Sequence, residues 1–314
     1  MKLHQFINLN KKSPCSQLGY FAFIAAGFFL LAQMVSLFIL MLFGLSDLQS
    51  LSMAQMVQDP TILQGLKWGQ AISSLLIFVA TGMVLSWLKT GNFWRFYGIQ
   101  QVPKWGLLLA SLALFIVSVP IIQWLNGINQ NIVFPPALQH IEQWMQALEK
   151  EGEIVTKAFL QGNSVAHLFV NLLIVAAIPA FGEELLFRGG LQTLLVKCLN
   201  KPHLAIFMGA FLFSLLHFQF YGFLPRFILG LVLGYMYYYT NNLWYPVLFH
   251  FVNNGLQVFL VWAGIISLDS QADELLPNMP VWLVLPALAL FVFSGWWFKQ
   301  QASKVQTPVN DGNI

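Results

Sequence analysis

The sequence predicts an all-α protein, a polytopic membrane helix bundle with about eight transmembrane helices. The first observation is composition: 58% of the 314 residues are hydrophobic and 9% are charged, whereas soluble domains have roughly 45 to 50% and 25%. The second is that uncharged stretches of about 20 residues or more, enough to cross the hydrocarbon core as a helix, recur along the chain. The third is that most charged residues lie between these stretches. An ordinary soluble protein is therefore excluded.

Each predicted span is an apolar stretch bounded by charged or turn-forming residues. In chain order the predicted spans are 20–44, 68–88, 105–125, 158–196, 203–220, 227–240, 243–266 and 281–298. The first lacks the short apolar core and small-residue cleavage site of a signal peptide, so we expect it to be retained. Within the fourth, Pro179 and Gly182 could kink or break the helix.

The segment 139–157 lies between the third and fourth spans and is the most polar part of the chain interior. Its apolar residues Ile141, Trp144, Met145 and Leu148 recur at helical spacing. This pattern predicts either an amphipathic helix at the membrane interface or a solvated loop helix with one packed face.

Charge placement predicts the orientation of the chain in the membrane. With both termini inside, the inner segments hold Lys2, Lys11, Lys12, Lys89, Arg95, Lys104, Lys197, Lys201, Lys299 and Lys304. Acidic residues predominate in the outer segments, so the positive-inside rule makes the N- and C-termini cytoplasmic. The net charge of +3 is too small to indicate nucleic-acid binding. Because no eukaryote-type retention or lipidation signal is present, we expect a multi-pass protein of a bacterial plasma membrane.

The sequence contains two cysteines, Cys15 and Cys198, which lie far apart in the chain. They cannot form a disulfide framework, and they lack the spacing of a metal site. We therefore assign neither of them a role.

Three charged residues, Glu183, Glu184 and Arg188, lie inside the fourth predicted span. A charge in the bilayer interior costs at least roughly 2.5 to 3.5 kcal/mol, so such residues indicate a functional site. Glu184 and Arg188 have the spacing and order of a helical ion pair. Glu183 points about 100° away around the helix and has Phe187 at the corresponding position. Glu183 is thus the candidate general base, and the alternative is an ion-pair cluster that only fixes helix packing.

Two histidines in other predicted spans add to this group. His217 follows Phe213 by four residues, and His250 precedes Asn254 by four. Neutral imidazole can accept a proton, bind a metal or donate a hydrogen bond between helices. At 1.5 Å per residue, Glu183 and His217 both lie about 21 Å from the inner ends of their helices. His250 lies only about 12 Å from its helix start, so a tilt is needed to bring it level.

These residues form three motifs in a fixed order on separate predicted helices: Glu183-Glu184-x-x-x-Arg188, Phe213-x-x-x-His217 and His250-x-x-x-Asn254. The set resembles the CAAX protease and bacteriocin-processing (CPBP) family, also called the Abi family, and matches its motifs without substitution. The chain would then divide into three regions. Region 1–162 holds the first three spans and the amphipathic segment, region 163–266 is the CPBP-like catalytic core, and region 267–314 holds the last span and a polar tail.

The resemblance implies a hydrolase, an intramembrane endopeptidase similar to the enzyme that removes the last three residues from prenylated proteins. The motif residues would then take three roles: Glu183 with His217 activating a water molecule, Glu184 with Arg188 supporting the site, and His250 with Asn254 stabilising the oxyanion.

The cofactor remains open between two mechanisms. Glu183, His217 and His250 could bind Zn²⁺ or another divalent metal and leave a position for water, as the family's metalloprotease label implies. Equally, a carboxylate and an imidazole can deprotonate water without a metal. We favour water activated by Glu183 and His217, with a metal as the alternative.

We therefore expect an endopeptidase whose polar cavity opens from the inner half of the membrane. Its partners would be membrane lipids and a membrane-bound or lipidated peptide substrate. We expect no nucleic-acid partner. Two alternatives of other classes remain. One is a non-catalytic membrane scaffold or chaperone of the same family, and the other is an ion-coupled transporter, which would also place Glu and His inside the membrane.

Overall fold

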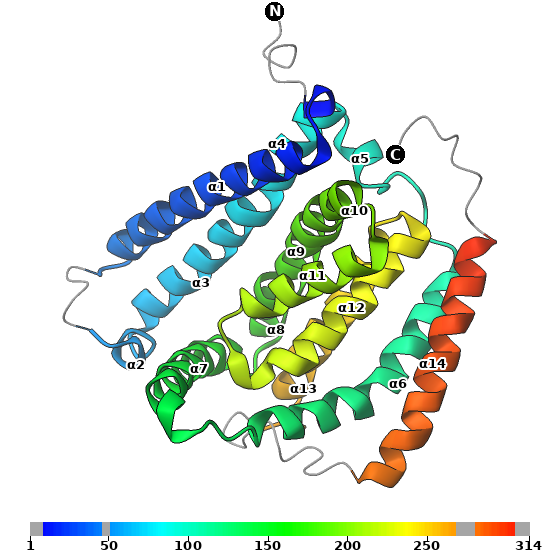
Figure 1. Cartoon of the computed structure of the whole chain (residues 1–314). Helices are drawn as coiled ribbons and strands as arrows, with labels where there is room; N and C mark the ends of the chain where they lie inside the picture. The colour runs from blue at the N-terminus through cyan, green and yellow to red at the C-terminus, as the bar shows by residue number, and fades with distance from the viewer. Residues whose placement is uncertain (1–8, 46–50, 268–279, 305–314) are drawn as a thin grey trace, which may run out of the picture.

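The computed structural model is a bundle of helices, most of which run side by side (Figure 1). It describes residues 9–45, 51–267 and 280–304, and within these ranges the chain forms helices and no strand. In the described part, six helices are long and apolar enough to cross a membrane. The predicted class, a polytopic α-helical membrane protein, is thereby confirmed, and the count of about eight crossings stays a prediction.

The six candidate spans coincide with predicted ones. They are α1 (Pro14–Leu42), α3 to α4 (Pro60–Lys89), α6 (Trp105–Gln130), α8 to α10 (Val165–Leu199), η7 with α12 (Phe220–Thr240) and the greater part of α14 (Val281–Ser303). The two other predicted spans correspond to α11 (Pro202–Leu215), a shorter apolar helix, and α13 (Trp244–Trp262). Helices outside these spans are α2 (Met53–Met56), α5 (Phe93–Phe96) and α7 (Gln139–Leu160).

The fourth predicted span begins later than expected. Ala158 belongs to α7, which ends at Leu160, and Gly162 then adopts a left-handed backbone with φ of 119°. A new helix begins after Ser164, whose side chain accepts a hydrogen bond from the backbone N–H of His167. Because glycine adopts a positive φ at little cost and serine is a strong N-cap, the local sequence separates α7 from the span.

From Val165 to Leu199 the chain forms one continuous helix, so Pro179 and Gly182 do not break it. The helix consists of α8 (Val165–Asn171), the π-helical η5 (Leu172–Ala177), α9 (Ile178–Glu184), the π-helical η6 (Leu185–Gln192) and α10 (Thr193–Leu199). π-helical turns are rare and are frequently found at functional sites. Here they lie on both sides of the short helix that carries the two adjacent glutamates.

The bundle is arranged as a central group of helices between two flanking pairs (Figure 1). α1 packs on α3 on one flank, and α6 packs on α14 on the other. Between them, the helix 165–199 packs with α11, α12 and α13. The three predicted regions therefore pack on one another, and their boundaries stay a prediction.

Tyr97 connects the loop before α6 to the helix that carries the glutamates. It is fully buried, and its hydroxyl donates a hydrogen bond to the carbonyl of Gly82 at 2.9 Å. Its ring lies so close to Gly189 that no Cβ fits at that position. The missing side chain of Gly189 therefore lets an aromatic residue pack beside the motif helix.

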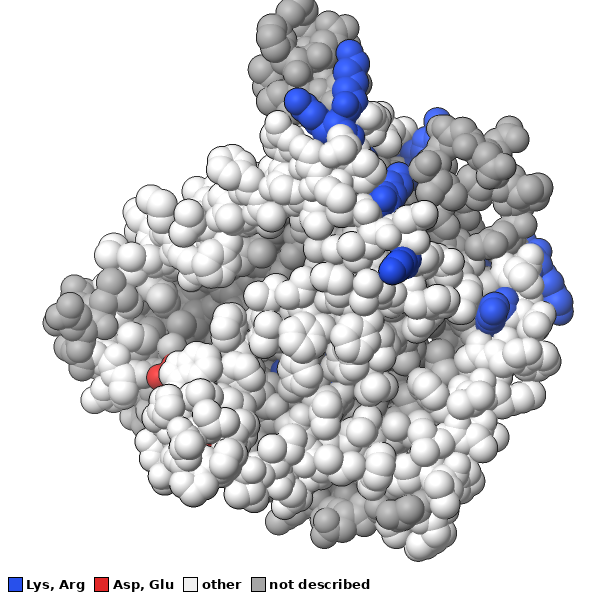
Figure 2. Space-filling model, viewed as in Figure 1, with Lys and Arg blue, Asp and Glu red and all other residues white. Residues whose placement is uncertain are grey.

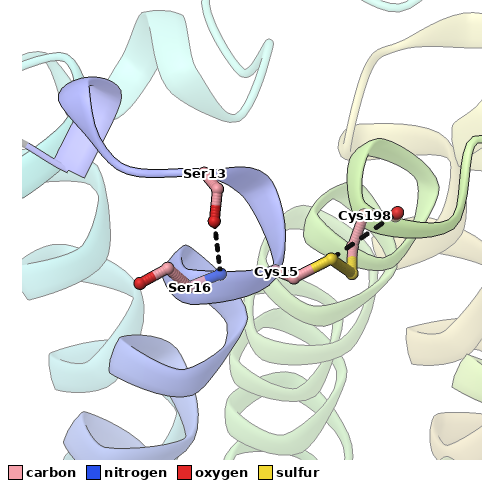
Figure 3. Close-up of a disulfide and its surroundings, with 4 residues drawn as sticks. All are labelled: Ser13, Cys15, Ser16 and Cys198. Atoms are coloured by element: carbon pink, nitrogen blue, oxygen red, sulfur yellow. Dashed lines mark hydrogen bonds between the residues drawn. A yellow bond between two sulfur atoms is a disulfide. The ribbon is translucent and has the colours of Figure 1, made fainter.

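The structure corrects the assignment of no role to the two cysteines. Cys15, at the start of α1, forms a disulfide with Cys198, near the end of α10 (Figure 3). The two residues are 183 positions apart in the sequence. They meet because α1 packs against α10, a long-range contact to which the cysteine spacing gives no clue.

Candidate active site

Glu183 lies at the centre of a polar group inside the bundle. Its Oε2 atom is 3.9 Å from Nε2 of His217 and 3.9 Å from Nε2 of His250. Both distances are too long for a direct hydrogen bond, and a single water molecule can bridge groups at such a separation. Oε2 is buried and makes no hydrogen bond to any described residue. Residues from three separate segments thus converge, and the expected mismatch in the depth of His250 is absent.

His217 lies in the turn after α11, because that helix ends at Leu215. The predicted span 203–220 is therefore too long at this end. The ring atom Nδ1 of His217 lies 2.6 Å from the carbonyl oxygen of Phe213. Since a carbonyl can only accept, Nδ1 carries the proton, and the Nε2 of the neutral ring presents a lone pair toward Glu183. Phe218 follows with a left-handed backbone, φ 53°, that turns the chain away from the helix axis.

His250 is 3% exposed and is held by the second glutamate of the motif. Its Nδ1 lies 2.9 Å from Oε1 of Glu184. The same oxygen accepts a hydrogen bond from Nη1 of Arg188 at 2.8 Å. Because Oε1 of Glu184 is ion-paired with the guanidinium, it is an acceptor and Nδ1 of His250 is the donor. The link between Glu184 and His250 is not visible in the sequence.

Arg188 contacts residues of three other helical segments, α9, α11 and α12. It forms the ion pair with Glu184 that their spacing predicts, and both side chains are buried. Its Nη2 donates to the carbonyl of Gly230 on α12 at 3.1 Å, and its guanidinium carbon lies 4.5 Å from the ring centroid of Phe213 on α11. A planar guanidinium suits this combination of two hydrogen bonds and ring stacking. Arg188 therefore fixes η6 relative to α11 and α12.

With both histidine rings neutral, the atoms that face one another at the centre of the site are acceptors. An ionised Glu183 has no proton to donate, and Nε2 of a neutral His217 or His250 carries a lone pair when Nδ1 carries the proton. Such a set is complementary to a group that brings protons or positive charge. A water molecule, with two O–H groups to donate, meets that requirement and would be polarised toward deprotonation.

The distances between these oxygen and nitrogen atoms differ from those between the ligands of a zinc ion. Tetrahedral Zn²⁺ with ligands at about 2.0 to 2.1 Å places the ligand atoms about 3.4 Å apart. Each histidine Nε2 here is 3.9 Å from the carboxylate oxygen, and the described residues contain no group of three or more His, Cys, Asp or Glu that could hold a metal ion. The residues have suitable chemistry, but their spacing is wider than that of zinc ligands.

Asn254 lies one turn beyond His250 on α13. Its Nδ2 donates to the carbonyl of Val175 at 3.3 Å, and its Oδ1 accepts from Nδ2 of Asn253 at 3.1 Å. Together with Glu183, His217 and His250, it lines a cavity of about 690 Å³. All four predicted catalytic residues thus border one space.

The cavity contains polar residues that the motifs do not include. Arg226 lies in its wall and donates hydrogen bonds to the carbonyl oxygen and the side-chain oxygen of Gln219 at 2.9 and 3.0 Å. Glu151 and Thr156 of α7 also line it. The only sequence signals for these residues are a charge at the start of a predicted span and the polarity of the amphipathic segment. The cavity extends from Glu183 toward α7, and the side of the membrane on which it opens stays a prediction.

Comparison with known proteins agrees with the motifs. Residues 165–256 match the family described as Type II CAAX prenyl endopeptidase Rce1-like. An uncharacterized Bacillus subtilis protein, YpbD, is 32% identical over 132 residues, which is 40% of this chain, and the match covers 62% of that relative's length. No solved structure matches the chain. The resemblance to CAAX-type membrane endopeptidases is thereby confirmed over the segment that holds every motif residue.

Proposed function

We propose, on the premise that residues 165–256 are Rce1-like, that this protein is an intramembrane endopeptidase. It would hydrolyse a peptide bond in a membrane-bound or lipidated peptide, as a multi-pass protein of a bacterial plasma membrane with cytoplasmic termini. The observation that carries the proposal is the position of Glu183 Oε2, which is 3.9 Å from two imidazole nitrogens at the wall of the cavity.

In the first step, a water molecule between Glu183 and His217 would attack the scissile carbonyl. The water gives one proton to the Glu183 carboxylate, and its other O–H donates a hydrogen bond to Nε2 of His217. The water oxygen then forms the new bond to the carbonyl carbon. Both acceptors are already oriented, Glu183 by burial in α9 and His217 by its contact with the carbonyl of Phe213. Preorganised acceptors of this kind lower the barrier because they need not reorient.

In the second step, the tetrahedral intermediate would collapse and the carbon–nitrogen bond would break. Glu183 returns the proton that it took from water to the leaving amine nitrogen, which restores the carboxylate. Atoms and charge balance without any other reactant. The products are a carboxylic acid and an amine, and transfer of the acid proton to the amine gives a carboxylate and an ammonium group.

The oxyanion of the intermediate would be stabilised by His250 and Asn254. Asn254 has two N–H groups on Nδ2, one of which it donates to Val175. In this role both ring nitrogens of His250 would carry protons, with Nδ1–H donating to Glu184 and Nε2–H donating to the oxyanion. The Glu184–Arg188 pair would therefore support catalysis through His250 rather than by contacting the substrate.

The test is a comparison of three purified full-length proteins on a quenched, lipid-anchored peptide library: the wild type, Glu183→Gln and Glu153→Gln. Glu183→Gln keeps the shape of the side chain but cannot accept the proton, so cleavage should fall by at least about 100-fold. Glu153 lies on α7, where it pairs with Lys157 outside the cavity, and its change should leave cleavage at the wild-type level. Equal cleavage by the wild type and Glu183→Gln would contradict the proposal and favour a non-catalytic scaffold.

A further inference from the structure

Basic side chains mark one end of the bundle, which we call the basic end. Among the described residues it comprises Lys11, Lys12, Lys89, Arg95, Lys104, Lys197, Lys201, Lys299 and Lys304. These residues adjoin the start of α1, α6 and α11 and the end of α4, α10 and α14, and no described acidic residue lies among them. In Figure 2 the Lys and Arg side chains gather toward the part of the molecule where the chain begins.

α7 lies at the opposite end of the bundle. It contacts α3, α8 and α13. Lys67 of α3 donates to the carbonyl of Phe159 near the end of α7 at 2.9 Å. α3 begins at Pro60 and α8 begins at Val165, whereas the helices that continue from them reach the basic end at Lys89 and Leu199. Figure 1 likewise shows α7 far from the start of α1.

The cavity lies between the catalytic residues and this α7 end. On the helix 165–199 its lining residues fall between Ile174 and Glu183, and on α13 they fall between His250 and Val258. Beyond Glu183, toward the basic end, the interior is filled by buried side chains: Tyr97, Leu185, Phe187, Tyr237 and Tyr245, each at most 5% exposed. The packed core therefore closes the site on the side of the basic end.

The wall of the cavity reaches the surface at α7. Glu151 and Thr156 line the cavity and are themselves exposed. On the same helix, Trp144 is 52% exposed and its ring lies 5.5 Å from the ring of Phe220. A helix with exposed aromatic and acidic residues suits the boundary between the bilayer and water. The route from water to Glu183 thus passes α7.

We propose that the catalytic cavity opens on the non-cytoplasmic side of the membrane and receives a membrane-anchored polypeptide whose scissile bond lies at that outer surface. The positive-inside rule places the basic end in the cytoplasm, and the cavity opens at the opposite end. A lipidated C-terminus on the cytoplasmic side would meet the packed core rather than the cavity. The proposed position of the scissile bond rests on the proposed endopeptidase function, whereas the orientation of the cavity does not.

The Cys15–Cys198 bond provides an independent check of this orientation, because it lies at the basic end, close to Lys12 and Lys197. Disulfides persist in oxidising compartments, whereas cysteines in the cytosol are kept as thiols. If the basic end is cytoplasmic, the bond of the structure forms only after oxidation outside the cell, and alkylation of the wild-type protein in rapidly quenched cells should find both cysteines as thiols. A pair that is fully oxidised in such cells would overturn the proposed orientation.

The main experiment uses single cysteines in a Cys15→Ser, Cys198→Ser background. Thr156→Cys reports on the cavity mouth, and Gln101→Cys is a matched control, since Gln101 is a neutral, exposed residue in the loop at the basic end. A membrane-impermeant maleimide should label Thr156→Cys in intact cells and Gln101→Cys only after permeabilisation. The reverse pattern, or labelling of Gln101→Cys in intact cells, would overturn the proposal.

A second experiment tests on which side of the membrane the substrate is cut. Two single-span reporters carry the same cleavable segment, taken from the peptide assay above, on either the non-cytoplasmic or the cytoplasmic flank of the span. Only the first reporter should be cut. Cutting of the second reporter alone would overturn the proposed position of the scissile bond. If neither is cut while Thr156→Cys is labelled from outside, the endopeptidase proposal fails and the orientation of the cavity stands.

Discussion

Glu184 Oε1 lies 2.9 Å from Nδ1 of His250, so a carboxylate on α9 orients an imidazole on α13. The same oxygen accepts the hydrogen bond of Arg188, whose guanidinium balances its charge. The neighbouring Glu183 points to the other side, where its Oε2 faces two ring nitrogens. Adjacent residues of one type therefore differ in chemistry because Glu184 is hydrogen-bonded to the guanidinium of Arg188, whereas Oε2 of Glu183 faces the two imidazoles.

Replacing Arg188 with Met should destabilise the protein strongly. The change leaves Glu184 buried without its cation, and breaking a buried pair in this way costs about 3 to 5 kcal/mol. The expected result is a lower Tm and a lower folded yield in detergent. Lys157→Ala is the matched control, because it breaks the more exposed pair with Glu153 and should cost about 1 kcal/mol or less. A wild-type Tm for Arg188→Met would refute the structural role of the pair.

Replacing each histidine with Gln should separate catalysis from stability. Both changes should lower peptide cleavage by at least about 100-fold, because His217 would accept a hydrogen bond from the attacking water and His250 would stabilise the oxyanion. His250 is buried and bonded to Glu184, so His250→Gln should also lower the Tm. The hydrogen bond of His217 is to the Phe213 carbonyl of its own turn and its side chain is more exposed, so His217→Gln should change the Tm less. An equal loss of Tm in the two variants would contradict the network around Glu184.

Gly189→Ala should disturb the packing of the motif helix. A Cβ at this position would overlap the ring of Tyr97, and overpacking of a buried site costs about 1 to 3 kcal/mol. Gly27→Ala, in the exposed part of α1, meets no atom within 4 Å and should leave the Tm unchanged or raise it. Thermal unfolding of the two variants checks this prediction, which equal Tm values would contradict.

Oxidised protein should be stabilised by the Cys15–Cys198 bond. A native disulfide contributes about 2 to 4 kcal/mol, chiefly by restricting the unfolded chain. Reductant should therefore lower the Tm of the oxidised wild type to that of Cys15→Ser, and it should leave Cys15→Ser unchanged. The prediction fails if reductant shifts both proteins by the same amount.

Metal removal provides a test of the proposed water activation. The carboxylate and imidazole atoms are wider apart than zinc ligands, so we expect a chelator to leave peptide cleavage at its starting level. Metal analysis of the active protein before and after treatment is the accompanying measurement. Loss of cleavage on chelation, with recovery on adding Zn²⁺, would show instead that Glu183, His217 and His250 bind a metal.

Local sequence was sufficient for much of the fold. Apolar stretches of about span length predict helices, because a bilayer requires every backbone polar group to be satisfied within the segment. The spacing of Glu184 and Arg188 predicts an ion pair, because side chains four residues apart lie on one helical face. The places where the sequence misled are those where a helix ends early, as at Leu215, or is interrupted by a turn, as at Gly162.

The sequence by itself determined the class of protein and the candidate site residues, and it predicts the side of the membrane on which the basic residues lie. Only the tertiary structure decided which atoms meet: His250 with Glu184, Cys15 with Cys198, and the cavity with α7. The reason is that periodicity and spacing report on one helix at a time. Contacts between helices depend on rotation, tilt and packing, which involve residues far apart in the chain.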